Sequence, residues 1–375
     1  MAIYDISPTW RTEVQNKARG GIPTCDNSSI STDLVAWNQI KTLLEKSQNN
    51  GTAFSQGIVS TYSLVYSVAF VFNGGVLAPN GDIHFVPYAA NRGQKINSSG
   101  VVSTYSLVYT TSNAYIGGVL SSNGDIHFVP SSAVVGQKIN SSGVVSTYSL
   151  AYTTSAAYSG GIISPNGDIH FVPSSAVVGQ KISVAGVVST YSLLNSGSFN
   201  YSGGVLAPNG DIHFIPIGAS IGQKINISSI VSTYILVSGG NFSGAVLSSS
   251  GDIIFIPVGS NKGQKIDISS GVVSTYSLVY TTSNAYTGGV LSPNGDVHFV
   301  PSSANRGQKR NISGIVSTYS LVYTNGNYAY WGGILAPNGD IHFIPYGATI
   351  GQKISTLPAK PLNIGLCCSP FFNKF

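Results

Sequence analysis

Residues 74–87 read GGVLAPNGDIHFVP, and close variants of this stretch return along the chain. Its central Asn-Gly-Asp is typical of the turn that joins two antiparallel strands, and its final proline has no N–H to donate to a strand ladder. The stretch therefore predicts a β-hairpin whose first strand opens with two glycines and whose second strand ends at the proline. The recurrence of this hairpin decides the fold.

Three landmarks recur seven times each, at a spacing of 41 to 44 residues. They are the Gly-Asp of the hairpin, a Gly-Gln-Lys motif and a Ser-Thr-Tyr motif. A fixed period of this length indicates a repeat architecture. The aspartates are Asp82, Asp125, Asp168, Asp211, Asp252, Asp296 and Asp340, the lysines are Lys95, Lys138, Lys181, Lys224, Lys265, Lys309 and Lys353, and the tyrosines are Tyr62, Tyr105, Tyr148, Tyr191, Tyr234, Tyr276 and Tyr319.

Each repeat has room for four short strands. The hairpin supplies two, Gly-Gln-Lys-Ile is the third, and Val-Val-Ser-Thr-Tyr-Ser-Leu-Val-Tyr is the fourth. Four strands in about 43 residues is the size of one β-propeller blade. A transmembrane barrel would need strands of about ten residues. The sequence therefore predicts an all-β fold, a seven-bladed β-propeller of four-stranded antiparallel blades.

The order of the pieces predicts that the ring is closed by an N-terminal strand. The chain enters the repeats with a fourth-strand sequence at residues 57–66 and leaves them after a third strand at residues 351–355. An open array would leave both ends as unpaired edges, which invite aggregation. We expect residues 58–66 to pair with residues 351–355 and complete the seventh blade.

The propeller is expected to span residues 51–355, with a different segment at each end. Residues 1–50 form a short helical extension, in which Ser31-Thr32-Asp33 caps an amphipathic helix at about residues 32–48. Residues 356–375 form an apolar C-terminal tail. The helix or the tail would dock on the propeller itself or on a protein partner, such as a capsid or assembly component.

The composition excludes several classes of protein. Only 8% of the residues are charged, the net charge is +5, and no window offers the roughly 20 apolar residues of a membrane-spanning helix. A dense basic face for nucleic acid is also missing. No signal peptide is apparent at the N-terminus, so the localisation stays unknown, with the virion or cytoplasm favoured. The three cysteines, Cys25, Cys367 and Cys368, form no disulfide framework.

The repeat resembles a known group of propeller repeats. The sequence GGVLAPNG, followed by an alternating strand that ends in proline, is similar to β-propeller repeats in large DNA viruses and some bacterial proteins. The resemblance covers about residues 55–355. It implies a propeller fold and association with a virus particle, and it implies no particular site.

One aromatic residue stands two positions before each glycine pair and predicts a collar of rings near the axis. Such rings could stack on sugars or hold an inserted peptide, and packing between blades is the alternative. The collar consists of Phe72, Tyr115, Tyr158, Tyr201, Phe242, Tyr286 and Tyr330, with Trp331 beside the last.

The residue before each Gly-Gln-Lys motif varies around the ring. Loops from second to third strands and from fourth to first strands emerge on one face of a propeller, so variation there indicates a face that carries specificity. Ordinary drift in unconstrained loops is the alternative. The varied residues are Arg92, Val135, Val178, Ile221, Lys262, Arg306 and Ile350.

Six repeats place a histidine two residues after the hairpin aspartate, and the fifth has Ile254 instead. One blade offers at most two ligands, fewer than zinc prefers, so we predict buried, hydrogen-bonded histidines between blades rather than a metal site, and no cofactor. The lysines are expected to pair with the aspartates of their own blades. The histidines are His84, His127, His170, His213, His298 and His342.

Two functional hypotheses follow, because no set of unlike catalytic groups gathers at one place. The first is a non-enzymatic binding or assembly module on a virus particle, with the varied loop face as its interaction surface. The alternative is a carbohydrate-binding lectin with equivalent sites between the blades. An Asp-His hydrolase at the channel mouth is a third and weaker hypothesis.

Overall fold

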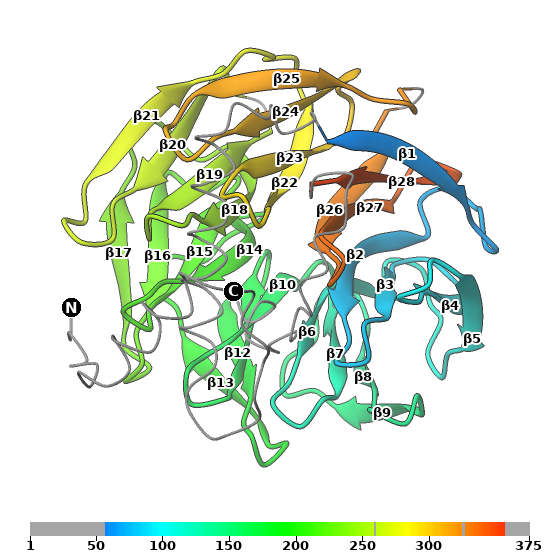
Figure 1. The fold of residues 1–375 in the computed structure, drawn as a ribbon. Coiled ribbons are helices and arrows are strands. Elements are labelled where there is room, and N and C mark those ends of the chain that lie inside the picture. The colour runs from blue at the N-terminus through cyan, green and yellow to red at the C-terminus, as the bar shows by residue number, and fades with distance from the viewer. Residues whose placement is uncertain (1–56, 259, 325–326, 357–375) are drawn as a thin grey trace, which may run out of the picture. The chain divides into compact units, whose positions relative to one another are not determined.

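The computed structural model describes residues 57–258, 260–324 and 327–356. In these residues the chain forms 28 strands and no helix, and the strands assemble into seven four-stranded antiparallel sheets (Figure 1). The predicted all-β, seven-bladed propeller is therefore confirmed. The expected helix at residues 32–48 lies outside the described residues, and so does the expected tail at residues 356–375 apart from its first residue.

The strands follow the predicted order within each repeat. The first strands are β2 (Phe72–Leu77), β6 (Tyr115–Leu120), β10 (Tyr158–Ile163), β14 (Tyr201–Leu206), β18 (Phe242–Leu247), β22 (Tyr286–Leu291) and β26 (Tyr330–Leu335). The second strands are β3 (Ile83–Pro87), β7 (Ile126–Pro130), β11 (Ile169–Pro173), β15 (Ile212–Pro216), β19 (Ile253–Pro257), β23 (Val297–Pro301) and β27 (Asp340–Pro345).

The outer half of each sheet contains the other two strands. The third strands are β4 (Arg92–Ile96), β8 (Val135–Ile139), β12 (Val178–Ile182), β16 (Ile221–Ile225), β20 (Lys262–Ile266), β24 (Arg306–Arg310) and β28 (Ile350–Ser355). The fourth strands are β5 (Val102–Ser106), β9 (Val145–Ser149), β13 (Val188–Ser192), β17 (Val231–Ile235), β21 (Val273–Ser277), β25 (Val316–Ser320) and β1 (Ile58–Ser63). We number the blades 1 to 7 by their first strands, from β2 to β26.

The seven blades form a closed ring. Each first strand lies against the first strand of the next blade, and β26 of blade 7 lies against β2 of blade 1. Blade 7 takes its fourth strand from the start of the repeats, because β1 pairs with β28 from Ile58 opposite Ser355 to Ser63 opposite Ile350 (Figure 1). The N-terminal segment thus covers the edge that β28 would otherwise expose.

The glycine pairs allow the first strands to approach one another. In blade 1, Phe72 pairs with Pro87 and Gly75 with Phe85, so the first strand carries one extra residue in a β-bulge. Gly74 sits in this bulge with a φ of 82°, and a Cβ there would lie 3.3 Å from the Cα of Gly117 in the next blade. Only glycine suits both the backbone angle and the space.

The hydrophobic core is divided into seven clusters. In a representative cluster, Tyr115, Ile126 and Phe128 of blade 2 pack with Val76 and Val86 of blade 1. The cluster therefore joins two neighbouring blades as well as filling the space within one.

A buried glutamine ties each third strand to the preceding blade. The Oε1 atom of Gln137 in β8 accepts hydrogen bonds from the backbone N–H groups of Val108 and Tyr109, at 3.0 and 2.8 Å, just after the fourth strand of blade 1. The Oε1 of Gln94 accepts one from Tyr66 at 2.6 Å in the same way. This contact connects the segment after β1 to blade 1, so it also helps to hold the ring closed.

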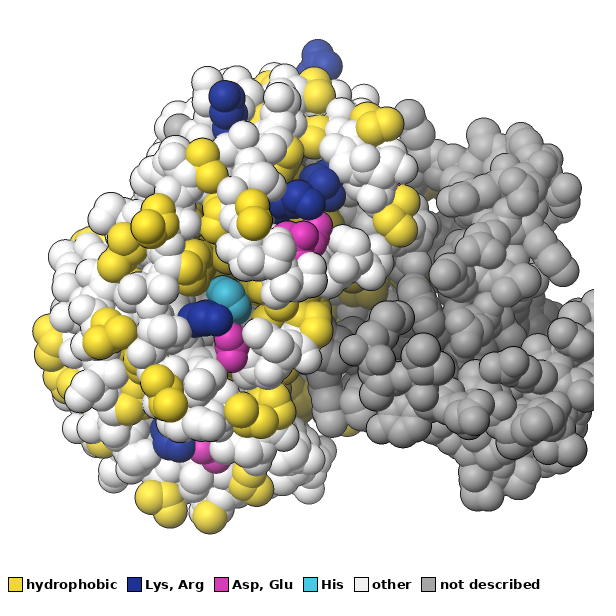
Figure 2. Space-filling view, turned by 90° about the vertical axis from the view of Figure 1, so that its left-hand side faces the viewer, with side chains coloured by type: hydrophobic (Ala, Val, Ile, Leu, Met, Phe, Trp, Pro, Cys, Tyr) yellow, Lys and Arg dark blue, Asp and Glu magenta, His cyan; other side chains and the backbone are white. Residues whose placement is uncertain are grey.

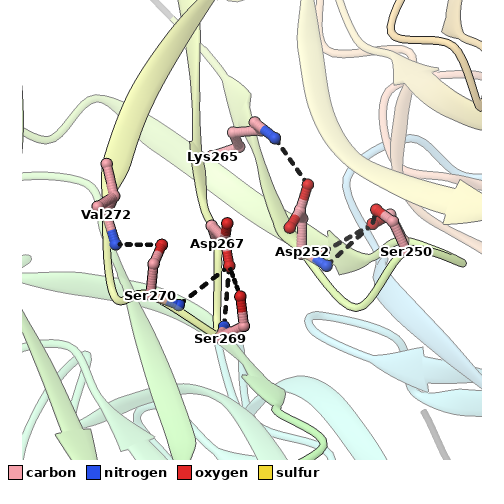
Figure 3. A network of polar contacts seen from close by, with 8 residues as sticks. Ser250, Asp252, Lys265, Asp267, Ser269, Ser270 and Val272 are labelled. Carbon is pink, nitrogen blue, oxygen red and sulfur yellow. Dashed lines mark hydrogen bonds and ion pairs between the residues drawn. The ribbon is translucent and has the colours of Figure 1, made fainter.

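The two faces of the ring differ in how the strands are connected. The turns between first and second strands and between third and fourth strands lie on one face, which we call the turn face. The other face, which we call the loop face, holds the second-to-third and fourth-to-first connections. The turn face has a short ion pair in every blade, such as Lys265 Nζ to Asp252 Oδ2 at 2.7 Å (Figure 3).

The same Lys–Asp pairing repeats in all seven blades, at N···O distances of 2.5 to 2.7 Å. In the space-filling view, some of the dark-blue basic groups lie directly beside magenta acidic groups, among scattered hydrophobic side chains, while those at the top have no acidic group beside them (Figure 2). The expected pairing of each lysine within its own blade is therefore confirmed, and these charges neutralise one another.

Candidate functional site

The structure places the predicted aromatic collar inside the blades. Seven of its eight members are at most 1% exposed: Phe72, Tyr115, Tyr158, Tyr201, Phe242, Tyr286 and Tyr330. Several tyrosine hydroxyls in this group donate to backbone carbonyls, as Tyr115 does to Val135 at 3.0 Å. These seven rings fill the cores and present no face to a ligand, so we remove them from the candidate site. Trp331, one position further along β26, is only half-buried.

The varied residues at the starts of the third strands do lie on the loop face. Arg92, Lys262 and Arg306 are exposed, whereas the aliphatic members Val135, Val178, Ile221 and Ile350 are partly buried. The three basic side chains belong to blades 1, 5 and 6. The charges on this face are therefore gathered on one part of the ring.

The histidines are buried between neighbouring blades, because the equivalent Ile254 of blade 5 packs against Ala285 and Tyr286 of blade 6. The Nδ1 of His127 lies 3.3 Å from the hydroxyl oxygen of Tyr148 in the same blade, and burial lowers the pKa of His127 to about 4. Blade 5 has Ile254 at this position, and there the Tyr276 hydroxyl donates instead to the carbonyl of Phe255 at 2.7 Å. Among the described residues, no group of three or more His, Cys, Asp or Glu side chains could hold a metal ion.

Blades 7 and 1 differ from the others in the residue that follows the second strand. It is Tyr346 in blade 7 and Tyr88 in blade 1. The other five blades have Ser131, Ser174, Ile217, Val258 and Ser302 at this position. The second residue of the first strand shows a similar contrast, because Trp331 of blade 7 corresponds to Asn73, Ile116, Ser159, Ser202, Ser243 and Thr287. Aromatic residues therefore concentrate in one sector of the loop face.

These side chains touch one another around Tyr346. Its ring centroid lies 5.4 Å from that of Trp331, 5.1 Å from that of Phe70 and 5.9 Å from that of Tyr88, all in edge-to-face arrangements. Tyr328 lies in the connection just before Trp331, and its hydroxyl accepts a hydrogen bond of 3.2 Å from the side-chain amide of Asn284. We call Phe70, Tyr88, Tyr328, Trp331 and Tyr346 the aromatic patch.

Two members of the aromatic patch have an unfavourable backbone conformation. Phe70 and Tyr328 have φ angles of 63° and 60°, in the left-handed region, and their side chains are 48% and 38% exposed. Asn113 and Asn284 occupy the corresponding position in blades 2 and 6, and asparagine adopts this conformation at lower cost. Ala156 and Phe199 of blades 3 and 4 share the left-handed conformation, so it is a feature of the repeat, and the patch is distinguished by its cluster of rings instead.

The electrostatics of the loop face favour a negative partner. All eight aspartates among the described residues lie at the turns of the opposite face, and no glutamate follows Glu45 in the sequence. Arg92 lies four residues beyond Tyr88 in the same connection, and the backbone N–H of Tyr328 donates to Ser303, close to Arg306. Arg306 belongs to blade 6 and Arg92 to blade 1, the blades on either side of blade 7.

The hydroxyl groups of Tyr88 and Tyr346 are neutral at physiological pH. Burial raises the pKa of Tyr88 and of Tyr346. Both hydroxyls can therefore donate a hydrogen bond to a ligand bound beside them. Sequence reasoning missed this pair, although the residue after each second-strand proline is easy to compare across the seven repeats.

Comparison with known proteins yields similarity in structure but not in sequence. No family model and no curated protein matches the chain. The structure resembles that of a streptogramin B lyase, with a TM-score of 0.71 and 20% identity over 81% of this chain and 99% of the other. It is also similar to a catalytically inactive variant of virginiamycin B lyase from Staphylococcus aureus, solved with Quinupristin, with a TM-score of 0.70 and 20% identity over 80% of this chain and 99% of that one.

A fungal alcohol oxidase solved with copper is similar at a lower level, with a TM-score of 0.60 and 12% identity over 80% of this chain and 76% of the oxidase. At these identities the likeness establishes the fold and leaves the activity open. The resemblance to known propeller repeats is thus confirmed at the level of a seven-bladed β-propeller.

The comparisons correct the function expected from the sequence. We expected a non-enzymatic assembly module on a virus particle, or else a lectin, but the similar structures named above are enzymes, two of them lyases. The repeat symmetry belongs to the scaffold and leaves the number of functional sites open. Within the described residues, no helix has the length and hydropathy of a membrane span.

Proposed function

We propose that the protein binds a small aromatic compound with negative charge on the loop face, over blades 7 and 1. The observation that carries this proposal is the confinement of the aromatic patch to that sector. Five blades have small or aliphatic residues where Tyr88 and Tyr346 stand, and only blade 7 has a tryptophan at the second position of its first strand.

The shape of the patch suits a flat ligand. Trp331, Tyr346 and Tyr88 pack edge to face and keep part of their surface accessible, while Phe70 and Tyr328 extend from the loops beside them. A planar ring that stacks on the patch would bury apolar area on both partners and gain the additional attraction of aromatic pairs. The tyrosine hydroxyls and the Asn284 amide would fix its orientation.

The charge of the ligand follows from the surroundings of the patch. Arg92 and Arg306 are exposed, and the described part of the loop face has no carboxylate to neutralise them. A carboxylate or phosphate on the ligand would therefore meet a favourable potential, and two arginines could bind its oxygens.

Catalysis on the bound compound is a second candidate function. It is favoured by the tyrosine pair, whose protonated hydroxyls could donate hydrogen bonds to negative charge that develops on a ligand, while their raised pKa disfavours proton transfer from them. The two lyases of similar fold make elimination, the breaking of a C–O or C–N bond with loss of a proton from the neighbouring carbon, the reaction to test first.

Isothermal titration calorimetry tests the binding with 1-naphthoate, 1-naphthyl phosphate and the neutral 1-naphthylmethanol. We expect the two anions to bind. Trp331→Ala should weaken their affinity about tenfold or more, because the central stacking surface is lost. Phe199→Ala is the matched control, since Phe199 is an exposed loop-face aromatic with a φ of 55° in another sector. Binding of none of the three compounds, or equal losses in both variants, would contradict the proposal.

Two further measurements resolve the charge and the chemistry. Arg92→Ala and Arg306→Ala should weaken the affinity for the two anions and leave the affinity for 1-naphthylmethanol unchanged. Lys262→Ala should have little effect on the affinity for any of the three compounds. For catalysis, quinupristin, the compound solved with one of the similar lyases, and aromatic esters are incubated with the protein, and the masses of the compounds are followed. A product that Tyr346→Phe abolishes would assign an enzyme, and intact compounds throughout would count against this second candidate.

Two expectations from the sequence remain proposals. A protein partner that docks through residues 1–50 or 356–375 is testable by comparing what copurifies with the full chain and with a chain lacking either segment. The kinship of the GGVLAPNG repeats with viral and bacterial propellers likewise stays a proposal, supported by the repeat sequence itself.

A further inference from the structure

The outer edge of blade 4 differs from the other six. Its sheet has the order β14-β15-β16-β17, so β17 pairs with β16 on one side and has no strand partner on the other among the described residues. The fourth strands of the other blades end in serine, but β17 ends in Ile235. This side chain is 83% exposed, more than any other large hydrophobic residue that the structure describes.

Ile235 belongs to a larger apolar edge. Ile227 and Ile230 in the turn before β17, and Val237 just after the strand, are each 58 to 62% exposed. No charged residue occurs between Lys224 and Asp252, and β17 contains neither a proline nor a bulge. Charges, prolines and bulges are the features by which edge strands normally avoid pairing with other chains. Because β17 lacks them, its edge is open to a partner strand.

We propose that β17 is a dimerisation edge, on which the β17 strands of two copies of this chain pair antiparallel. Pairing around a two-fold axis at Thr233 places Ile235 of each copy opposite Val231 of the other. Residues 231, 233 and 235 share one side of the strand, so both pairs lie on the same face as the two threonines. The edge is thus complementary to itself.

The substitution pattern explains why blade 4, and not another blade, would form this contact. In the other blades the same antiparallel pairing would bring serine, such as Ser192, opposite valine, such as Val188. Only in blade 4 does a branched aliphatic side chain meet valine twice across the axis. Because the strand has no net charge, two copies also meet without electrostatic repulsion.

Sedimentation velocity of the full chain over a range of concentrations tests the proposal. We expect a reversible dimer, which Ile235→Lys converts to monomer by placing two buried lysines in the contact. Ser192→Lys, the same position in blade 3, is the matched control and should dimerise as the unchanged chain does. Both side chains are exposed, and circular dichroism verifies that both variants fold.

Three results would overturn the proposal. The first is a chain that stays monomeric up to about 100 μM, a concentration at which even weak specific interfaces associate. The second is a dimer that Ile235→Lys leaves intact. The third is the formation of large aggregates that both lysine variants disperse equally. A cross-link tests the register in a chain whose Cys25, Cys367 and Cys368 are replaced by serine. Thr233→Cys should form an intermolecular disulfide and Thr190→Cys should not, and a dimer without the Cys cross-link at position 233 would disprove the pairing.

Discussion

The turn face and the loop face are built from the same seven repeats, but the repeats agree on one face and diverge on the other. Every blade has its Lys–Asp pair on the turn face, and six have the same buried histidine. On the loop face, the residue after the second strand varies from serine to tyrosine, and the residue before Gly-Gln-Lys from valine to arginine. Uniform contacts maintain the ring, whereas the variable face can hold a single, asymmetric site.

The largest expected effect is on the contacts that close the ring. Deleting residues 1–66 removes β1 and the Tyr66 N–H that binds Gln94, so blade 7 loses its fourth strand. We expect the shortened chain to lose cooperative thermal unfolding or to aggregate, as measured by circular dichroism and light scattering. Deleting only residues 1–50 leaves β1 in place and is the control. Equal melting of the two chains would show that β1 does not close the ring.

A smaller effect is expected where one glutamine joins two blades. Gln137→Ala removes the acceptor of two partly buried hydrogen bonds from backbone N–H groups of the preceding blade. The free energy of unfolding should fall by about 2–4 kcal/mol in denaturant titration. Val134→Ala, an exposed neighbour on the loop face, should change it by less than about 0.5 kcal/mol. A loss that is no larger for Gln137→Ala would mean that the blades are held by apolar packing alone.

The buried histidines predict a dependence of stability on pH. Burial lowers the pKa of His127 to about 4 from the ordinary 6.5, so between these values the unfolded chain binds a proton that the folded chain does not. The free energy of unfolding should therefore fall as the pH falls through this window, by up to about 1.4 kcal/mol per pH unit for each histidine.

His127→Ile tests this dependence, because blade 5 already accommodates Ile254 at the same position. From pH 6.5 to 4, the free energy of unfolding of the variant should decline less steeply than that of the unchanged chain. At pH 8 and above, the free energies of the two chains should depend on pH in the same way. A slope equal to that of the unchanged chain would indicate that His127 is not buried in its neutral form.

The smallest effect on stability is expected from the aromatic patch. Replacing Tyr88 and Tyr346 with serine, the residue of blades 2, 3 and 6, should lower the free energy of unfolding by less than about 1 kcal/mol each. The binding of 1-naphthoate should be lost in the same variants. A large drop in melting temperature would instead show that the aromatic patch stabilises the fold, and it would remove the main argument for a binding site.

Much of the fold was predictable because its information is local and repeated. The Asn-Gly-Asp turns, the proline ends of the second strands and the fourth-strand sequence before the first glycine pair specify strand boundaries directly. The observed β1 is shorter than expected, ending at Ser63 rather than residue 66, because the Tyr66 N–H leaves the strand ladder to bind Gln94 of the next blade.

The candidate site was only partly predictable. Arg92, Arg306 and Trp331 were selected from the sequence. The other collar members could not be distinguished from core residues by sequence, because an aromatic residue at the start of a strand suits a core as well as a surface. Phe72 and Trp331 differ by one position in the strand, and the bulge at the glycine pair decides which side faces the core.

The sequence by itself determined the number of blades, the strand order and the strand that closes the ring, because turn chemistry and periodicity act within a few residues. The tertiary structure alone decided which aromatic side chains are buried, that the histidines contact tyrosines of their own blades, and that Tyr88, Trp331 and Tyr346 meet. These contacts join residues up to 258 positions apart, and the closed ring, not any local pattern, brings them together.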